Sequence, residues 1–334
     1  MLRAGVVGLG VMGRHHSRVL ASLEGVEFAG VYDPAPAVPS TIEGRDVIKE
    51  LESFLDLGLD YCVVAAPTVY HLELGRTLAE RGVHALIEKP VASDSESARE
   101  LERVFTAAGL IGGVGHIERF NPALQSMRQR LEDGLLGEIY QIATRRQGPF
   151  PGRIADVGVV KDLATHDIDL TAWVSQQDYV TVNARTAHRS GRMHEDLVIA
   201  VATLSSGTIA THTVNWLSPF KERTTVVTGE NGALVADTLT ADLTYFQNGV
   251  AQNSWDGVSS FRGVSEGDVI RFALNKREPL RTEHEAFRDA VLTGETAGIV
   301  TLAEGTRVVE IAEQFVADGL DHKLQPESGT GTTR

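Results

Sequence analysis

Short apolar runs alternate with amphipathic stretches along the first third of the chain. The runs are rich in Val, Ala and Ile and too short for helices, which is typical of parallel strands buried on both faces. Strands are expected at 2–7, 26–32, 60–66, 84–87 and 111–114, and helices from about 11, at 71–81 and at 93–108. Ser93 and Glu96 predict a capping box for the third helix. This alternation predicts an α/β domain with a doubly wound parallel sheet.

From about residue 138 the pattern changes to β-rich segments separated by Gly, Ser and Asn. Hairpin turns are predicted at 205–207 and 230–232. Strands are expected at 138–146, 180–187, 197–204, 208–216, 224–228 and 233–237, with one helix at 161–174. The pattern predicts an α+β domain with an open, mostly antiparallel sheet that leaves one face free. Late helices at 283–292 and 302–317 are expected to pack back on the first domain.

A chain of 334 residues exceeds what one hydrophobic core usually supports. The change of pattern predicts one domain at 1–120 and a second, for substrate binding and oligomerisation, at 121–326. The end of the chain, 327–334, is rich in Ser, Gly and Thr and is predicted to be disordered.

A glycine-rich turn directly follows the first predicted strand. Gly8, Gly10 and Gly13 form the pattern G-x-G-x-x-G between a strand and a helix. Gly8 permits the tight turn, Gly10 lets the backbone approach a pyrophosphate, and Gly13 lets the helix pack closely on the strand. The helix that starts at Val11 and Met12 directs its first N–H groups at those phosphates. The first domain is therefore predicted to be a dinucleotide-binding Rossmann domain.

Asp33 ends the second predicted strand. An acidic side chain at this place can bond both hydroxyls of the adenosine ribose and would repel a 2′-phosphate. No Lys or Arg lies between Asp33 and Arg45. NAD is therefore favoured over NADP as the cofactor. The alternative is that Asp33 only forms a turn before Pro34.

Ligands of doubly wound sheets lie beyond the carboxyl ends of the strands. In this chain that rule selects 8–13, 66–68, 88–90 and 116–121 as the rim of one crevice. Besides the glycine turn and Asp33, the residues expected at the cofactor are Ala66, Pro67, Thr68, His71, Glu88 and Lys89.

Two segments offer groups for oxidising an alcohol, which needs a base for the hydroxyl proton and a site that holds the carbon against nicotinamide. Lys89, at the end of a buried strand, can bond the reacting oxygen or act as a base if burial lowers its pKa. Asp162 and His166 are four apart, so on a helix they share a face and reach one pocket. Histidine suits proton exchange near neutral pH. The alternatives are a surface lysine and a surface histidine flanked by acids.

The glycine turn, Glu88-Lys89-Pro90 and Asp162-x-x-x-His166, in this order, resemble the Gfo/Idh/MocA oxidoreductases. That family comprises glucose-fructose oxidoreductase, inositol dehydrogenase and related sugar dehydrogenases. The resemblance covers nearly the whole chain and includes Asn215-Trp216 and residues 227–232. It implies a Rossmann domain joined to an open-faced sheet domain. It also implies that Lys89, Asp162 and His166 form the catalytic set, with Lys89 and His166 as the two candidates for the base.

A finer resemblance, to UDP-N-acetylglucosamine 3-dehydrogenases, rests on residues 115–122 and 146–159. This chain has Lys161 directly before Asp162, whereas that group favours an apolar residue before the aspartate. Arginine forks could bind a diphosphate, and Asn121 could bond a sugar hydroxyl or an acetamido group. For each arginine the alternative is a solvated surface charge. The residues expected at the substrate are Lys89, His116, Arg119, Asn121, Arg146, Arg153, Asp162 and His166.

Charge and composition narrow the possible partners. A net charge of −14 argues against nucleic acid as a ligand. Cys62 is the single cysteine and is expected in a buried strand, so a reducing, cytoplasmic setting is favoured. The sequence has no apolar run long enough for a membrane span, and Leu2 to Val7 has the pattern of a strand, not of a signal peptide. No metal is expected, because His15 and His16 point apart on a helix and no metal-binding motif occurs.

The function expected from the sequence is NAD-dependent oxidation of a secondary hydroxyl on a sugar ring, at C3 of UDP-N-acetylglucosamine. One alternative is an inositol or free-sugar dehydrogenase of the same family, and another is an NAD-dependent sensor without turnover. A sheet face left open by the second domain predicts a homodimer or homotetramer.

Overall fold

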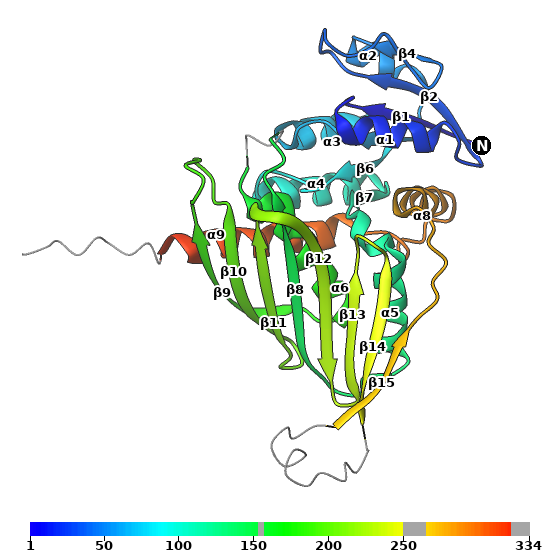
Figure 1. Ribbon diagram of the computed structural model, residues 1–334. Helices are drawn as coiled ribbons and strands as arrows, with labels where there is room; N and C mark the ends of the chain where they lie inside the picture. The colour runs from blue at the N-terminus through cyan, green and yellow to red at the C-terminus, as the bar shows by residue number, and fades with distance from the viewer. Residues whose placement is uncertain (153–156, 250–264, 322–334) are drawn as a thin grey trace, which may run out of the picture.

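The computed structural model describes residues 1–152, 157–249 and 265–321. The predicted tail at 327–334 lies outside these ranges. Within them, the first sheet has the order β3-β4-β2-β1-β5-β6-β7 and is parallel except for the β3–β4 pair (Figure 1). Its strands are β1 (Leu2–Val7), β2 (Val26–Tyr32), β3 (Thr41–Ile42), β4 (Arg45–Ile48), β5 (Tyr61–Val64), β6 (His84–Glu88) and β7 (Gly112–Gly115).

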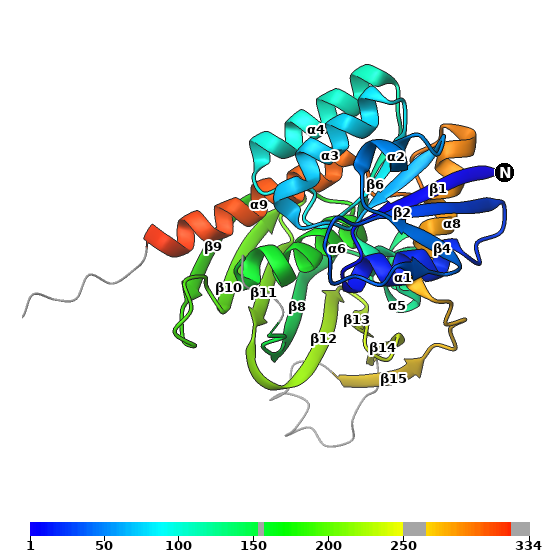
Figure 2. The ribbon, with the colours of Figure 1, turned by 90° about the horizontal axis from the view of Figure 1, so that it is seen from above.

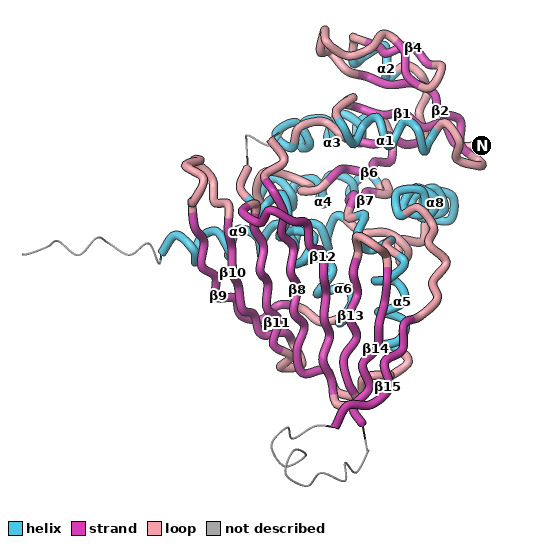
Figure 3. The backbone as a smooth tube through the Cα atoms, viewed as in Figure 1, coloured by secondary structure: helices cyan, strands magenta, loops and turns pink. Residues whose placement is uncertain are grey.

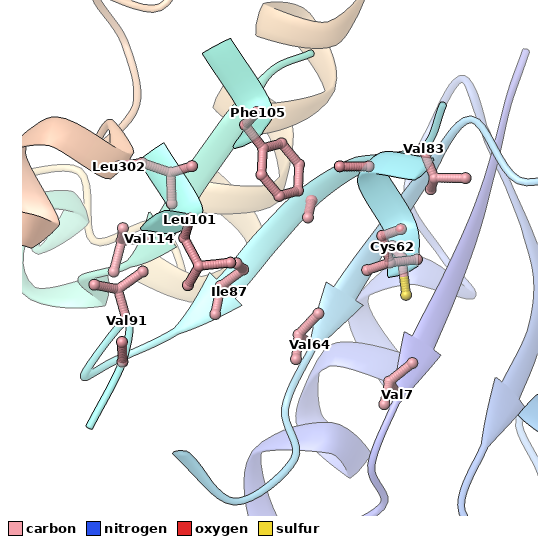
Figure 4. Packing of buried hydrophobic residues seen from close by; sticks show 14 of the residues in the cluster. Val7, Cys62, Val64, Val83, Ile87, Val91, Leu101, Phe105, Val114 and Leu302 are labelled. Carbon is pink, nitrogen blue, oxygen red and sulfur yellow. The ribbon is translucent and has the colours of Figure 1, made fainter. Parts of the chain in front are cut away.

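Helices cover both faces of this sheet, which confirms the doubly wound arrangement (Figure 2). On one face lie α1 (Val11–Leu20) and the late helix α8 (Pro279–Thr293), whose Phe287 ring packs on Tyr61 at 5.5 Å between centroids. On the other face lie α2 (Leu51–Leu55), α3 (His71–Glu80) and α4 (Ser95–Ala108). Figure 4 shows Val64, Ile87 and Leu101 filling the space between β5, β6 and α4.

The predicted capping box of α4 is wrong. The N-cap is Asp94, whose Oδ1 accepts a hydrogen bond from the Ser97 N–H at 2.8 Å. A carboxylate is a strong acceptor at a helix N-terminus, so α4 begins two residues after Ser93.

The second sheet has the order β15-β14-β13-β12-β8-β11-β10-β9 in the described part of the chain. Only β8 and β11 pair in parallel there, so the sheet is mostly antiparallel, as predicted. Both predicted hairpin turns are present. The strands are β8 (Ile139–Pro149), β9 (Tyr179–Ala187), β10 (Leu197–Leu204), β11 (Ile209–Asn215), β12 (Leu217–Gly229), β13 (Gly232–Asp237), β14 (Asp242–Gly249) and β15 (Ser265–Arg271).

One face of this sheet is covered and the other is open (Figures 1 and 3). The covering helices are α5 (Pro122–Glu132), α6 (Thr165–Ser175) and α9 (Leu302–Asp321). The open face carries exposed apolar side chains, among them Ile199 and Val201. Because α9 also contacts α4, it joins the two sheets on the covered side.

Two elements differ from the expected boundaries in ways that matter for the site. The predicted helix at 161–174 begins as a π-helical turn, η3 (Val160–Ala164), before α6 continues. The predicted strand at 224–228 begins earlier, at Leu217, because β12 pairs with β8 along this part too, across a register shift between Leu217 and Glu222; its first half is curved (Figure 1).

Candidate active site

The glycine turn after β1 has a conformation that only glycine permits at two of its positions. Gly8 has φ +94°, and a Cβ on Gly13 would lie 1.8 Å from the Gly8 carbonyl oxygen. Around Gly10, by contrast, a Cβ would meet nothing within 4 Å. Gly10 is also the N-cap of α1 and supplies no side-chain cap, so the first N–H groups of the helix stay available. The turn therefore fits the pyrophosphate of a dinucleotide.

Asp33 lies at the end of β2 beside this turn and is mostly buried. Its Oδ2 accepts the Leu9 N–H at 2.7 Å, so the carboxylate also orders the turn. Sequence reasoning missed Lys49, whose Nζ donates to the backbone oxygens of Asp33 (3.0 Å) and Ala35 (2.8 Å). The pairing of β4 with β2 brings this lysine to the ribose end of the site, although it lies beyond Arg45 in sequence.

The rim residues Ala66, Pro67 and Thr68 follow β5 and lead into the short helix η1 (Thr68–Tyr70). His71 lies behind them, buried, with Nε2 2.9 Å from the Ala66 oxygen and Nδ1 3.1 Å from the Pro90 oxygen. Burial lowers the pKa of His71. Its ring thus lies between the loops after β5 and β6, with each nitrogen within hydrogen-bond distance of a backbone oxygen.

Glu88 also acts from behind the rim. Its Oε1 lies 2.9 Å from His16 Nε2, and its Oε2 accepts the Lys89 N–H at 3.1 Å. Burial alone would raise the pKa of Glu88, but the contact with His16 and the charge of Lys89 lower it. Glu88 therefore fixes the backbone from which the Lys89 side chain starts.

The Lys89 side chain reaches from the end of β6 to the π-helical turn η3. Its Nζ donates to the backbone oxygen of Asp162 at 2.7 Å and lies 3.2 Å from Asp162 Oδ1. The Lys89–Pro90 peptide bond is cis. Both side chains are largely buried, so this ion pair is shielded from water.

His166, in the first turn of α6, lies beside this pair. Burial, followed by the charge of Lys89, holds the pKa of His166 well below its usual 6.5. The His116 ring stands perpendicular to it, 6.3 Å away between centroids. The Nδ1 atom of His166 is buried and has no partner in the described residues, which leaves Nε2 as the nitrogen that can face a ligand.

Asp162 and His166, expected on one helix face from their spacing of four, are not hydrogen-bond partners. In the described part of the chain no hydrogen bond joins the two, and the Asp162 carboxylate pairs with Lys89. A charged ammonium is a stronger partner for a carboxylate than a neutral imidazole is.

Two residues that the sequence argument did not assign hold the π-helical turn in place. Glu195 Oε1 accepts the Val160 N–H at 3.1 Å, and the neighbouring Gly158 has no room for a Cβ beside this carboxylate. Lys161 donates from Nζ to the Ser93 backbone oxygen at 2.7 Å. The lysine noted as a departure from the related group thus ties η3 to the loop that follows Lys89.

The predicted diphosphate forks of Arg119 and Arg146 are already occupied by carboxylates. Arg119 bonds Asp169 through Nε and Nη2 and Glu304 through Nη1 at 2.7 Å. Despite burial, these carboxylates raise the pKa of Arg119. A buried guanidinium with two carboxylate partners has no free charge for a diphosphate, so the geometry gives Arg119 a structural role.

Arg146 has the same kind of environment on β8. Its Nε lies 2.9 Å from Asp167 and its Nη1 2.8 Å from Glu118. Burial raises the pKa of Asp167 to about 6, although Arg146 opposes the shift. The expected diphosphate role is disfavoured for Arg146 for the same reason as for Arg119.

Of the remaining expected substrate residues, His116 lies close to His166, whereas Asn121 is engaged elsewhere. Asn121 caps α5, with its Oδ1 accepting the Ala123 N–H, and donates to the Thr238 oxygen. His116 is buried, and its Nδ1 lies 4.0 Å from Asp169. Arg153 lies outside the described residues.

Neither a metal-binding cluster nor a membrane-spanning helix occurs among the described residues. No group of three or more His, Cys, Asp or Glu side chains in them is arranged to hold a metal ion. None of the helices described is both long and apolar enough to cross a membrane.

Comparison with known proteins finds relatives over most of the chain. The family model described as an oxidoreductase family with an NAD-binding Rossmann fold (GFO_IDH_MocA) matches residues 2–116. The model for the GFO/IDH/MocA C-terminal domain matches residues 124–235. Both halves of the chain thus match models of one family.

Individual relatives agree with these matches. The chain is 29% identical to UDP-N-acetylglucosamine 3-dehydrogenase of Acidithiobacillus ferrooxidans over 294 residues, 87% of this chain and 88% of that enzyme. The solved structure of that enzyme superposes with a TM-score of 0.82 at 26% identity, covering 95% of this chain and 97% of the other. Inositol 2-dehydrogenase 2 of Saccharopolyspora erythraea is 30% identical over 203 residues, which span 58% of this chain and 60% of that enzyme.

Proposed function

Because the chain belongs to the Gfo/Idh/MocA family of NAD-binding oxidoreductases, we propose that it oxidises a secondary hydroxyl of a sugar ring, at C3 of UDP-N-acetylglucosamine. The observation that carries this proposal is the contact of Lys89 with Asp162 beside His166, at the same sheet edge as the glycine turn. A sugar-oxidising site needs both a cofactor cradle and proton-handling groups, and this edge offers both.

NAD, held by the glycine turn and Asp33, supplies the hydride acceptor when it is bound. Lys89 donates a hydrogen bond to the reacting oxygen and stabilises the negative charge that develops there. Lys89 Nζ already donates to the backbone oxygen of Asp162 and lies 3.2 Å from its carboxylate, so it stands at the site as a hydrogen-bond donor. Lys89 is therefore the donor, and the hydroxyl proton goes to another group.

That group is His166. Its pKa lies well below 6.5, so the ring is neutral near pH 7 and able to accept a proton. Its accessible Nε2 takes the hydroxyl proton, in the tautomer that carries the other proton on Nδ1. The products are a ketone on the sugar ring, NADH and one proton, which balances the oxidation.

A free-sugar or inositol dehydrogenase is the second candidate. One observation favours it: Arg119 and Arg146, the expected diphosphate ligands, are each neutralised by two carboxylates. The 30% identity to an inositol 2-dehydrogenase points the same way.

A substrate panel separates these candidates. We expect NADH absorbance to appear with UDP-N-acetylglucosamine and NAD, and the NMR spectrum of the product to carry the ketone at C3. UDP alone should compete for the site. Turnover of inositols without inhibition by UDP would favour the second candidate instead. Tight NAD binding with no turnover of any sugar would overturn both candidates and leave an NAD-dependent sensor without turnover as the remaining function.

The open face of the second sheet supports self-association into a homodimer or homotetramer. Ile199 and Val201 on β10 and Phe246 on β14 are about half exposed there, and a second copy would cover them. Light scattering coupled to gel filtration measures the mass in solution. A monomer at micromolar concentration would contradict this part of the proposal.

A further inference from the structure

Arg223 is a cation at the active site that the sequence argument did not single out. It lies on β12 and pairs directly with Arg146 on β8 in the antiparallel register. Residues opposite each other in such a pair project from the same face of the sheet. Since Arg146 is buried under the covering helices, Arg223 projects from the covered face too, where it is only partly exposed.

The two paired arginines differ in how their charge is balanced. Arg146 bonds two carboxylates, those of Asp167 and Glu118. Arg223 has no ion pair with any carboxylate in the described part of the chain. Its Nη1 donates to the backbone oxygens of Gln147 (2.8 Å) and Glu222 (2.9 Å). The Nε–Nη2 edge of the guanidinium makes no hydrogen bond with the described residues, so a complete two-pronged donor is left over.

The charge of Arg223 acts on the catalytic groups. Burial, followed by the like charge of Arg146, lowers the pKa of Arg223. The positive charge of Arg223 contributes in turn to the low pKa of His166. A partly buried cation opposite another cation costs folding free energy when no anion is bound. The charges of Asp167, Glu118 and Asp162 offset part of this cost without bonding the guanidinium, so an anionic ligand would complete its partners.

We propose that Arg223 binds an anionic group of the substrate, a phosphate or a carboxylate, through its free Nε–Nη2 edge, on the sheet face where Arg146 bonds Asp167 next to His166. The proposal rests on the proposed function and deepens it, because it requires a charged sugar rather than a neutral cyclitol. The planar fork matches the two oxygens of either anion. Arg223 thereby takes the role that sequence reasoning gave to Arg119 and Arg146.

Binding to the NADH-loaded protein tests this without turnover. Isothermal titration calorimetry is run with UDP-N-acetylglucosamine, N-acetylglucosamine 1-phosphate, glucuronate and neutral N-acetylglucosamine. We expect at least one anionic probe to bind more tightly than the neutral sugar. Arg223→Gln should weaken that probe by about 10- to 100-fold, as expected for loss of a charged hydrogen-bonded pair, and leave neutral N-acetylglucosamine unchanged.

The matched control is Arg145→Gln. Arg145 neighbours Arg146 on β8 but is exposed on the open face and pairs with Glu222, so its loss should leave every probe within about twofold. The melting temperature of Arg223→Gln should stay close to that of the wild type, since the variant removes a like-charge contact. Arg223→Lys keeps the charge without the fork and should recover part of the affinity.

The outcomes separate the sources of the anion. Weakening confined to the phosphorylated probes supports a phosphate subsite, and weakening confined to glucuronate supports a sugar acid. Equal affinity of wild type and Arg223→Gln for the anionic probes would overturn the proposal. It would also be overturned if the wild type bound every anionic probe no more tightly than neutral N-acetylglucosamine. Absence of turnover with every sugar would refute the proposed function but not this binding result.

Discussion

Lys89 Nζ lies 2.7 Å from the backbone oxygen of Asp162, although 73 residues separate the two in sequence. Lys89 follows β6 of the first sheet, and Asp162 belongs to the π-helical turn that packs on the second sheet. Neither half of the chain therefore forms the site alone. The π-helical turn is a local departure from the α-helix, of a kind that often occurs at functional sites.

Replacing Lys89 by Ala should lower kcat by about 100- to 1,000-fold, because a donor to the developing oxyanion is lost. NADH affinity should change little, since the glycine turn and Asp33 are untouched. Steady-state kinetics and NADH fluorescence titration measure the two quantities. Lys276→Ala, on an exposed lysine bound to the Thr240 oxygen, is the control. A Lys89→Ala variant with full activity would refute its catalytic role.

The acid limb of the pH profile for sugar oxidation should lie below pH 6.5. The base must be neutral, and the pKa of His166 is held well below 6.5 by burial and by Lys89. Activity is therefore retained as the pH falls through 6.5 and is lost only nearer the lowered pKa. kcat/KM measured against pH gives the limb, and His166→Asn should reduce kcat by about 100- to 10,000-fold. A limb at or above 6.5 that persists in His166→Asn would point to another base.

Lys161→Met should impair the reaction without impairing the cofactor. Lys161 donates to the Ser93 carbonyl and so fixes the π-helical turn that carries Asp162. Loss of the Lys161 ammonium lets Asp162 and Lys89 move apart. Small misplacements of catalytic groups cost about 10- to 100-fold in rate. We expect kcat to fall by about tenfold or more while NADH affinity holds. Recovery of kcat in Lys161→Arg would support positioning, and an unchanged kcat in Lys161→Met would exclude it.

The parts of the molecule that the sequence predicted best are those in which local pattern and tertiary packing agree. β1, β2 and β10 have the expected bounds because their apolar runs are buried as strands. The glycine turn was equally predictable, because close backbone approach leaves few residue types that fit. The family resemblance predicted that Lys89, Asp162 and His166 belong to one catalytic set.

The partners of charged side chains could not be predicted in this way. Arg119 and Arg223 are both arginines in polar stretches, yet one is neutralised by Asp169 and the other is not. That difference depends on strand register and helix placement over long separations. Lys49 was missed for the same reason, since only the pairing of β4 with β2 brings it to Asp33.

Asp33→Asn should weaken discrimination against NADP. The carboxylate charge that repels a 2′-phosphate is lost, while Lys49 remains nearby as a cation. We expect the NAD affinity to fall by about tenfold and the ratio of NADP to NAD affinity to rise by a similar factor. Fluorescence titration with both reduced cofactors measures these changes. Unaltered discrimination would mean that Asp33 serves only its hydrogen bonds from the Leu9 and Ala35 N–H groups.

Arg119→Met distinguishes a structural arginine from a substrate ligand. The substitution leaves Asp169, which is 1% exposed, without its fork and removes a partner of Glu304. Breaking a buried pair from one side costs about 3–5 kcal/mol, so the free energy of unfolding should fall by about that amount in urea titrations. KM for the sugar should stay within about twofold, because the guanidinium was already neutralised. Arg271→Met removes an exposed arginine that pairs with Asp242 and should alter neither quantity appreciably. A rise in KM of tenfold or more with little loss of stability would restore Arg119 to the diphosphate role and weaken the assignment of the anion to Arg223.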